Sequence, residues 1–372
     1  LRGLGSDNID YRLRNAKFNA FEGVRWLGMP IAALQELQSV LVLGSNLRKD
    51  HPLFAQRVRK AAKRGCKVCA INAQVQDWAL PVTASAVATK DWAQALADIA
   101  VAVAQAKGVP APVAGGTAPA QAQAIAQALL AGERKAILLG NAAAHHGHAA
   151  QLLALAQWIG EQTGATVGYL TEAANTVGAQ WVQAQPQKDG KNAGEMLTGA
   201  VKAAILLNTE PAFDAAAGAK GLEQADMVIT LSPFKANLDI SDVLLPVAPF
   251  TETSGTFVNA EGRVQSFHAV VKPLGDTRPA WKVLRVLANL LELPGFDYES
   301  SQDVLTAAIG AETKEVPSAL RSNITKVAAK VPENEAAEPV TASIYQLDGI
   351  VRRATSLQLT ADARLAREGG AA

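Results

Sequence analysis

The residues whose types and spacing could do chemistry are concentrated in the stretch 241–265, SDVLLPVAPFTETSGTFVNAEGRVQ. Its apolar run at 243–245 is too short for a helix, and two prolines end it, which predicts a buried strand leading into a rigid loop. Thr, Asn and Glu side chains then stand between Gly255 and Gly262, a composition typical of turns rich in hydrogen-bonding groups. These groups could hold a polar ligand or could satisfy one another within a structural loop.

Two cysteines, Cys66 and Cys69, have a spacing that occurs in redox dithiols, zinc sites and iron–sulfur sites. Residues 66–71, CKVCAI, have the composition of a strand, in which positions three apart point to opposite faces. An iron–sulfur cluster usually takes four thiolates, so two cannot hold one. We therefore predict that both cysteines are reduced, buried and structural.

Three histidines, His145, His146 and His148, lie close together. A metal-binding pair on a helix would be spaced i,i+4, and an extended pair would be spaced i,i+2, which only His146 and His148 satisfy. Neither a carboxylate nor a cysteine lies close by in the sequence. We predict no metal site here, and a position in a loop or in the first turn of a helix.

Polar residues also follow several apolar runs. If these runs are strands, the polar residues lie at the carboxyl ends of the strands, where an open α/β sheet binds its ligands. Gly44-Ser45-Asn46 follows the run 40–43 and precedes His51-Pro52. The glycine could instead make a tight turn and the asparagine could begin a helix. Neither the glycine-rich dinucleotide fingerprint nor a P-loop motif occurs in the chain, which argues against NAD and P-loop nucleotide binding.

The apolar runs and the segments between them predict the fold class. The runs 40–43, 137–139, 204–207 and 227–231 do not alternate with polar residues, as in strands of a parallel sheet that is covered on both faces. The segments between them, such as 53–64, repeat their apolar residues with a helical period. The sequence therefore predicts an α/β fold with Rossmann-like parallel sheets.

Composition shifts along the chain predict its organisation. Residues 107–120 are rich in Ala, Pro and Gly, and residues 313–339 mix charge, Ala and Pro with little period, so both resemble connectors. We expect an irregular C-terminal segment in which residues 344–359 form a docked helix. The predicted division is a first α/β lobe in 1–110, truncated at its N-terminal side, a connector and helix in 111–135, a second lobe in 136–298, and a linker with a docking segment in 299–372.

The charge balance of the 372-residue chain excludes some classes of partner. Lys plus Arg number 35 against 34 Asp plus Glu, and no basic stripe or polybasic stretch occurs, so we expect neither nucleic-acid binding nor membrane-surface binding. The longest apolar runs are of strand length, and we expect no direct membrane insertion. The chain opens on Leu1, and we expect it to be part of a longer polypeptide.

The order of the polar motifs resembles the molybdopterin oxidoreductase superfamily. In that family an acidic residue, Gly-Thr-Phe and Asn-x-Glu-Gly-Arg-Val-Gln follow a strand of the type DVVLP, as they do in residues 241–265. The Gly-Ser-Asn and His-Pro motifs, and residues 173–179, AANTVGA, match further motifs in the expected order. The resemblance implies two lobes of the molybdopterin oxidoreductase type and a vestigial pocket for the pterin nucleotide. Its candidate residues are Gly44, Ser45, Asn46, His51, Asn175, Gly178, Glu252, Gly255, Thr256, Asn259, Glu261 and Arg263.

The N-terminal segment departs from the active members of that superfamily. Residues 7–17, DNIDYRLRNAK, resemble the formate dehydrogenase segment that supplies the metal-binding thiolate or selenolate and a catalytic histidine. On that alignment Ala16 takes the position of the metal ligand and Lys17 that of the histidine. A methyl group cannot ligate molybdenum, so the resemblance implies no catalytic residue and no metal ligand in this chain.

The two ends of the chain, residues 1–10 and 344–358, are similar to one subunit family of the bacterial NADH-quinone oxidoreductases, respiratory complex I. It is the peripheral-arm family in which a region with iron–sulfur clusters precedes a region of molybdopterin-oxidoreductase type. This resemblance implies a catalytically silent scaffold without a cofactor of its own, with the iron–sulfur clusters in the preceding region. It implies other hydrophilic-arm subunits as partners, and a cytoplasmic location peripheral to the inner membrane.

Two alternatives to the scaffold stay open at this point. One is an active molybdenum or tungsten bis-guanylate oxidoreductase related to formate dehydrogenase. The other is an interaction module that never bound a cofactor.

Overall fold

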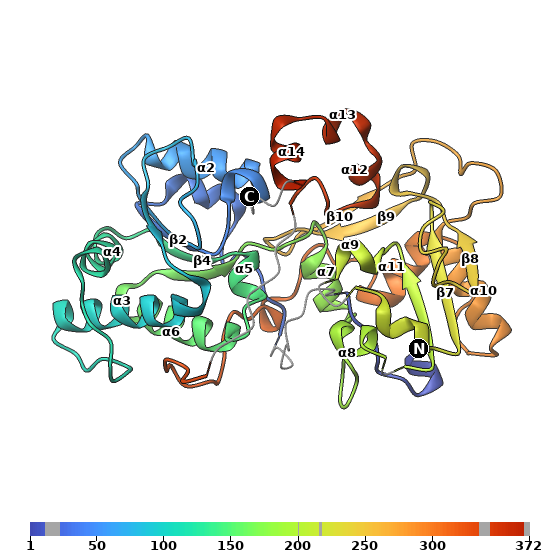
Figure 1. Ribbon diagram of the computed structural model, residues 1–372, viewed down its shortest axis with the longest axis horizontal. Helices are drawn as coiled ribbons and strands as arrows, with labels where there is room; N and C mark the ends of the chain where they lie inside the picture. The colour runs from blue at the N-terminus through green and yellow to red at the C-terminus, as the bar shows by residue number, and fades with distance from the viewer. Residues whose placement is uncertain (12–22, 200, 216–217, 335–342, 368–372) are drawn as a thin grey trace.

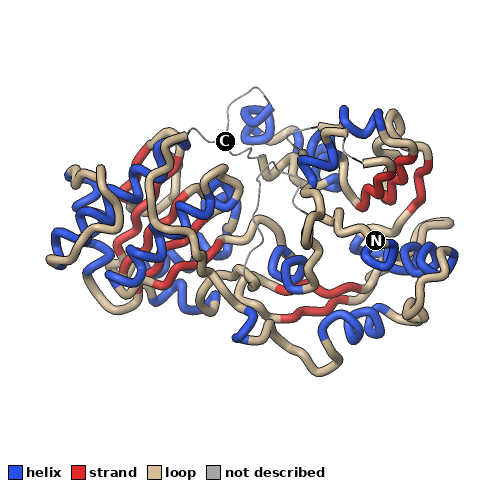
Figure 2. The backbone as a smooth tube through the Cα atoms, turned by 90° about the horizontal axis from the view of Figure 1, so that it is seen from below, coloured by secondary structure: helices blue, strands red, loops and turns tan. Residues whose placement is uncertain are grey.

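The computed structural model describes residues 1–11, 23–199, 201–215, 218–334 and 343–367. It has a mixed α/β architecture with two parallel sheets, and an antiparallel hairpin lies between them (Figures 1 and 2). The predicted fold class is therefore confirmed.

The first sheet contains five parallel strands in the order β3-β2-β1-β4-β5. Every residue of the central strands β1 and β4 is buried, whereas the edge strand β3 is partly exposed. This burial explains why the central strands are continuous apolar runs, since both of their faces meet helices. The strands are β1 (Ser39–Leu43), β2 (Lys67–Asn72), β3 (Thr83–Ala86), β4 (Lys135–Leu139) and β5 (Thr166–Tyr169).

Helices cover both faces of this sheet. Helices α3, α4 and α6 contribute to the buried cluster on one face, and η2 and α2 contribute to the cluster on the other. Helix α2 begins at Pro52, a residue suited to a first helical turn, and α3 ends at Gly108 in the left-handed conformation. The elements are η2 (Ile31–Glu36), α2 (Pro52–Ala62), η3 (Thr89–Asp91), α3 (Trp92–Lys107), α4 (Ala120–Leu130) and α6 (Ala149–Thr163).

The lobe boundary predicted at residue 136 lies inside the first sheet. Strand β4 pairs with β1 in parallel, with Leu41 opposite Ile137, so it belongs with the strands that precede it. Residues 111–134 are part of the connection between β3 and β4 of the same sheet, and α4 packs on α3. The assignment of residues 136–169 to a second lobe was wrong, because strand order depends on pairing that no local pattern encodes.

The second sheet has three parallel strands in the order β6-β7-β8. Leu206 and Val228 on one face form a small core with Leu197 of α8 and Leu222 of η4. The elements are α7 (Thr176–Trp181), α8 (Ala193–Leu197), β6 (Ala203–Leu207), η4 (Lys220–Gln224), β7 (Met227–Ser232) and β8 (Val243–Pro246).

An antiparallel hairpin follows the second sheet and contacts α7. Its residue Val258 packs with Val24, Val177 and Val316 in a separate buried cluster. Val316 is fully buried, and its N–H donates to the Gly262 carbonyl at 2.8 Å, so this part of the predicted linker is anchored to the hairpin. The elements are η5 (Phe250–Glu252), β9 (Gly255–Val258), β10 (Val264–Phe267) and η6 (Ser318–Leu320).

The C-terminal part is more regular than predicted. Helix α11 lies within residues 299–372 and begins with a reciprocal cap between Ser300 and Asp303. The helix predicted for 344–359 is two short helices, because Ala354 adopts an extended conformation between them. Helices α12–α14 lie between the two sheet-bearing lobes (Figure 1). The helices are α10 (Ala280–Leu290), α11 (Ser301–Ile309), α12 (Gly349–Arg353), α13 (Thr355–Gln358) and α14 (Ala361–Arg367).

Four short helices complete the secondary structure of the residues that the structure describes: η1 (Arg2–Leu4), α1 (Leu47–Asp50), α5 (Asn141–Ala144) and α9 (Pro211–Asp214). Among the described residues, we find no helix with the length and apolar content required to cross a bilayer.

Candidate functional site

The first predicted motif lies where strand order reverses in the first sheet, between the carboxyl ends of β1 and β4. Gly44 has a φ of +69°, and its N–H donates to the Ile71 carbonyl at 2.9 Å. A Cβ on Gly44 would lie 2.7 Å from the backbone nitrogen of Ala143, and one on Gly140 would lie 2.4 Å from the Gly44 carbonyl oxygen. These glycines therefore allow two loops to touch at the position where open α/β sheets bind ligands.

Asp50, which no pattern in the sequence singles out, organises the rest of this turn. Its Oδ2 accepts a hydrogen bond from the Ser45 hydroxyl at 2.8 Å and another from the backbone N–H of Asn46 at 3.0 Å. The Ser45 hydroxyl and the amide of the predicted motif thus have a partner within the chain.

His51 precedes helix α2, and its ring stacks on Phe54 with 5.2 Å between ring centroids. Burial lowers the pKa of the imidazole to about 4, so the ring is neutral at pH 7. Its Nε2 is buried and has no hydrogen-bond partner among the residues that the structure describes. Such an atom could receive a bond from a ligand, but a neutral imidazole offers no charge to an anion.

The second and third predicted motifs meet at strand β9. The Asn175 side chain accepts a hydrogen bond from the Val258 N–H at 2.8 Å. A Cβ on Gly178 would lie 2.2 Å from the Asn175 Oδ1, so glycine is needed for this contact. Both residues therefore fasten the start of α7 to the hairpin.

The loop between β9 and β10 uses its polar side chains internally. Asn259 Oδ1 accepts from the N–H groups of Glu261 at 3.2 Å and Arg263 at 2.9 Å. Glu261 Oε1 lies 3.4 Å from the Arg263 Nε, and its Oε2 accepts from the Ile31 N–H at 2.7 Å. These contacts agree with the interpretation of a structural loop and attach the loop to the segment that leads into the first sheet.

The remaining candidates of the hairpin also contact the protein itself. Glu252 accepts from the Leu274 N–H at 2.8 Å, and the Thr256 hydroxyl bonds to the Ser266 hydroxyl at 3.0 Å across the two strands. A Cβ on Gly255 would lie 2.7 Å from the Phe267 ring. Each candidate therefore has a structural contact, whether or not it also meets a ligand.

A pocket that no motif in the sequence indicates lies beside the carboxyl ends of β4 and β5. Arg25 donates to the Tyr169 hydroxyl, with its Cζ 4.9 Å from the ring centroid, and His145 pairs with Glu172. Burial lowers the pKa of Arg25 and raises that of Tyr169. Nothing local in the sequence reveals the His145–Glu172 pair, since 27 residues separate its members. The polar lining residues are Tyr11, Arg25, Asn141, His145, Tyr169, Thr171, Glu172, Thr176 and Gln180.

The cysteines and histidines do not form a metal site in the part of the chain that the structure describes. Cys66 and Cys69 belong to the buried clusters on opposite faces of the first sheet, as predicted. Burial raises the pKa of each thiol to about 11, so both are protonated at pH 7. His146 and His148 bond to the carbonyl groups of Thr89 and Asn334, respectively.

The turn after β6 repeats the turn after β1. Asn208 has a φ of +50°, and its N–H donates to the Leu231 carbonyl at 2.9 Å, as that of Gly44 does to Ile71. Asp214 Oδ2 accepts from the Thr209 hydroxyl at 3.2 Å and the Glu210 N–H at 2.7 Å, as Asp50 does from Ser45 and Asn46. The two sheets therefore present equivalent turns at their carboxyl edges.

Residues 12–22, including Ala16 and Lys17, lie outside the described residues. The predicted replacement of a metal ligand at Ala16 consequently stays a prediction from the sequence.

Comparisons with known proteins agree with this architecture. The family profile described as Molybdopterin oxidoreductase matches residues 1–290. The "Putative formate dehydrogenase" of Staphylococcus aureus strain USA300 is 38% identical over 77 residues, and that of strain MRSA252 is 33% identical over 84 residues. These matches cover 20% and 22% of this chain, and each spans only 8% of the relative's length.

One solved structure shows a similar fold. Acetylene hydratase from Pelobacter acetylenicus superposes with a TM-score of 0.50 at 14% sequence identity, over 77% of this chain and 53% of that protein. Since the family profile matches most of the chain, this chain belongs to the molybdopterin oxidoreductase family.

Proposed function

We propose that the chain is a catalytically silent scaffold, the molybdopterin-oxidoreductase-like region of a peripheral-arm subunit of bacterial NADH-quinone oxidoreductase. In this role it is part of a complex that passes electrons from NADH to quinone through iron–sulfur clusters outside this chain. The resemblance of its two ends to that subunit family supports the finer assignment.

The proposal that the chain is catalytically silent rests on the metal ligands that its residues can offer. The family's soft metal ligand is a thiolate or selenolate, but the two cysteines of this chain are buried at β2, on opposite faces, with pKa values of about 11. Residues 12–22 contain no cysteine in their sequence. The residues present therefore do not fit the metal centre of a molybdopterin cofactor with chalcogen ligation.

The contacts of the motif residues support the same proposal. Asn175, Asn259 and Glu261 bond to the backbone of the chain, and Cβ atoms at Gly44 and Gly178 would meet protein atoms. The motifs thus have a structural use that explains their presence without a bound cofactor.

One face of the second sheet has partly exposed apolar side chains around the buried Leu231, which supports a place in a larger assembly. Leu207, Met227 and Val243 share one face by strand register and are 42%, 41% and 38% exposed. Parallel sheets are normally covered on both faces, so this face is suited to a protein contact. We propose neighbouring hydrophilic-arm subunits as its partners, on the cytoplasmic side of the inner membrane.

The proposal is tested by elemental analysis and by assembly. We expect no stoichiometric molybdenum or tungsten in the purified protein and no guanine nucleotide released on denaturation. In the assembled enzyme, Glu261→Ala and Asn259→Ala should lower assembly with partner subunits and leave NADH-to-quinone turnover per assembled complex nearly unchanged. Glu161→Ala, at an exposed glutamate of α6, serves as the matched control. A large loss of normalised turnover with assembly intact would contradict the scaffold role.

The second candidate is an active molybdenum or tungsten bis-guanylate oxidoreductase related to formate dehydrogenase. The identity of 38% over 77 residues with a protein of that printed name favours it. About one metal atom per chain, together with formate-dependent reduction of an artificial acceptor, would establish this candidate in place of the scaffold.

A further inference from the structure

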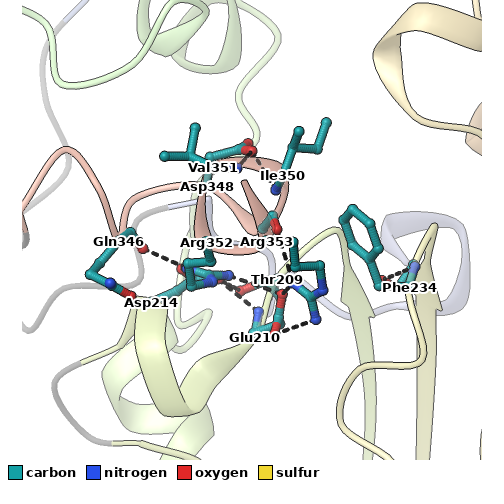
Figure 3. Close-up of polar contacts among 12 residues, drawn as sticks. Thr209, Glu210, Asp214, Phe234, Gln346, Asp348, Ile350, Val351, Arg352 and Arg353 are labelled. Carbon is teal, nitrogen blue, oxygen red and sulfur yellow. Dashed lines mark hydrogen bonds and ion pairs between the residues drawn. The ribbon is translucent and has the colours of Figure 1, made fainter. Parts of the chain in front are cut away.

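Residues 343–367, which we call the strap, fold back over the second sheet. Asp348 caps helix α12 by accepting from the N–H groups of Ile350 and Val351. Gln358 donates to the carbonyl groups of Tyr345 at 3.0 Å and Val351 at 2.9 Å. These bonds close the strap on itself, so α12 is held in a defined orientation. Figure 3 shows the contacts of Asp348 with Ile350 and Val351.

Two consecutive arginines of α12 reach the turn after β6. Arg353 forms a bidentate ion pair with Glu210, with Nη1 at 2.7 Å from Oε1 and Nη2 at 3.1 Å from Oε2. Arg352 bonds to Asp214 Oδ1 at 2.7 Å and to Glu210 Oε1 at 3.1 Å. The side chains of Arg352, Glu210 and Asp214 are 7%, 11% and 13% exposed and are largely shielded from water, whereas that of Arg353 is 37% exposed.

Two aromatic rings complete the recess around the arginines. The Cζ of Arg352 lies 5.1 Å from the Phe213 ring centroid, and that of Arg353 lies 4.2 Å from the Phe234 ring centroid. A planar guanidinium can stack on a ring while its N–H groups point to a carboxylate, whereas the ammonium of lysine is a compact charge without a fork. The recess therefore has the chemistry that selects guanidinium groups.

The strap approaches the acidic turn closely at Gly349. A Cβ on Gly349 would lie 2.9 Å from Glu210 Oε1 and 3.5 Å from the Phe234 ring. The backbone of α12 thus lies directly on the acidic turn.

The other end of the strap reaches the equivalent turn of the first sheet. Asp362 of α14 pairs with Lys49 of α1 at 3.3 Å, and Ala363 is buried. The Lys49 and Asp362 side chains are 30% and 51% exposed, so this ion pair is the weaker attachment. The strap consequently spans the carboxyl edges of both sheets, where α/β folds bind ligands.

We infer that the strap is an intramolecular closure: its Arg352–Arg353 pair occupies a guanidinium-selective recess formed by Glu210, Asp214, Phe213 and Phe234, and thereby closes the carboxyl edge of the second sheet. Burial of Glu210 opposes its ionisation, but the bonds from Arg353 and Arg352 outweigh this and hold its pKa below the ordinary value. The inference goes beyond the scaffold proposal, since a closed edge is compatible with any role of the assembled protein.

Hydrogen exchange of the full chain at pH 7 tests this closure. We expect the amides of α12 and of residues 209–214 to exchange roughly tenfold faster or more in Arg352→Ala/Arg353→Ala than in the natural chain. Arg352→Lys/Arg353→Lys keeps both charges but removes the forks, so it should lose most of the same protection. Arg364→Ala, which removes an exposed arginine of α14, is the matched control and should change neither region.

The charge-swapped variant Glu210→Arg/Arg353→Glu should recover part of the protection that Glu210→Arg alone loses. Full protection in the double alanine variant would overturn the inference, because apolar contacts would then hold the strap. Full protection in the double lysine variant would overturn it as well, because the recess would then respond to charge alone. The lysine variant retains the charge balance of the fold, so it gives a result even where the alanine variant is too unstable to measure.

Discussion

The turns after β1 and β6 share a backbone and differ in their side chains. In both, a left-handed residue continues the ladder to the next strand, and an aspartate binds a hydroxyl and a backbone N–H. Where the first turn has Asn46 and Lys49, the second has Glu210 and Phe213. The first is therefore neutral to cationic and the second is acidic and aromatic, and the strap meets them with Asp362 and with two arginines, respectively. The fold determines the backbone of the turn, and the side chains at the two positions that differ determine which residues of the strap bind to it.

The largest difference between the two turns should appear when their aspartates are removed. Asp214→Ala breaks two turn bonds and leaves the buried Arg352 with less compensation, and we expect a loss of about 3–5 kcal/mol in unfolding free energy. Asp50→Ala breaks the equivalent bonds without a buried arginine, and a loss of about 1–3 kcal/mol is expected. Urea unfolding of both variants measures the difference. Equal losses would show that Arg352 adds little to the second turn.

The two turns should also respond to acid in different pH ranges. His51 beside the first turn has a pKa of about 4 when folded, against about 6.5 when unfolded. The unfolded chain therefore binds a proton that the folded chain does not, and stability falls by roughly 2–3 kcal/mol as pH falls from about 6.5 to 4. His51→Phe should remove this part of the loss in urea unfolding measured across that range. His146, whose pKa is also lowered chiefly by burial, is present in both proteins, so the difference between them isolates His51.

Glu210 in the second turn has a lowered pKa, so its contribution to stability is present above the pKa of an unfolded glutamate, about 4.3, and is lost at lower pH. The protection of the α12 amides, measured relative to the intrinsic exchange rate at each pH, should fall below this pH in the natural chain, and Glu210→Gln should already show reduced protection at pH 7. A loss of protection near pH 6 would instead implicate a histidine.

A smaller difference is expected at the left-handed residues. Gly44→Ala would place a Cβ 2.7 Å from a backbone nitrogen, and a loss of roughly 1–3 kcal/mol is expected from overpacking alone. Asn208→Gly, at φ +50°, relieves a positive φ and should change stability by less than about 1 kcal/mol. Thermal unfolding of the two variants makes the comparison. A large loss in Asn208→Gly would show that the asparagine side chain, and not its backbone, holds the second turn.

The smallest effect is expected at the outer end of the strap. Asp362→Ala breaks an exposed ion pair with Lys49, and such pairs contribute about 0.2–1 kcal/mol. Hydrogen exchange should rise in α14 and stay unchanged in α12. If α12 were released too, the two attachments would be one cooperative unit.

The sequence alone determined the local elements and the environment of the cysteines. Apolar runs without alternation identified strands β1, β4, β6 and β7, and helical period identified α2, because both patterns arise from burial within a few residues. The alternation of a strand also assigned Cys66 and Cys69 to opposite faces. The family motifs were recognisable in the sequence because each is a short continuous stretch.

Only the tertiary structure decided which strands share a sheet and which charges meet. Strand β4 pairs with β1, which lies almost a hundred residues earlier in the chain. This pairing places β4 in the first sheet, whereas the sequence predicted that a second lobe begins at residue 136. The contact of Arg352 with Asp214 joins residues 138 apart, and that of His145 with Glu172 joins residues 27 apart. No local pattern records such contacts, because they depend on chain crossovers and on side-chain positions that burial energy fixes only once the whole fold has formed.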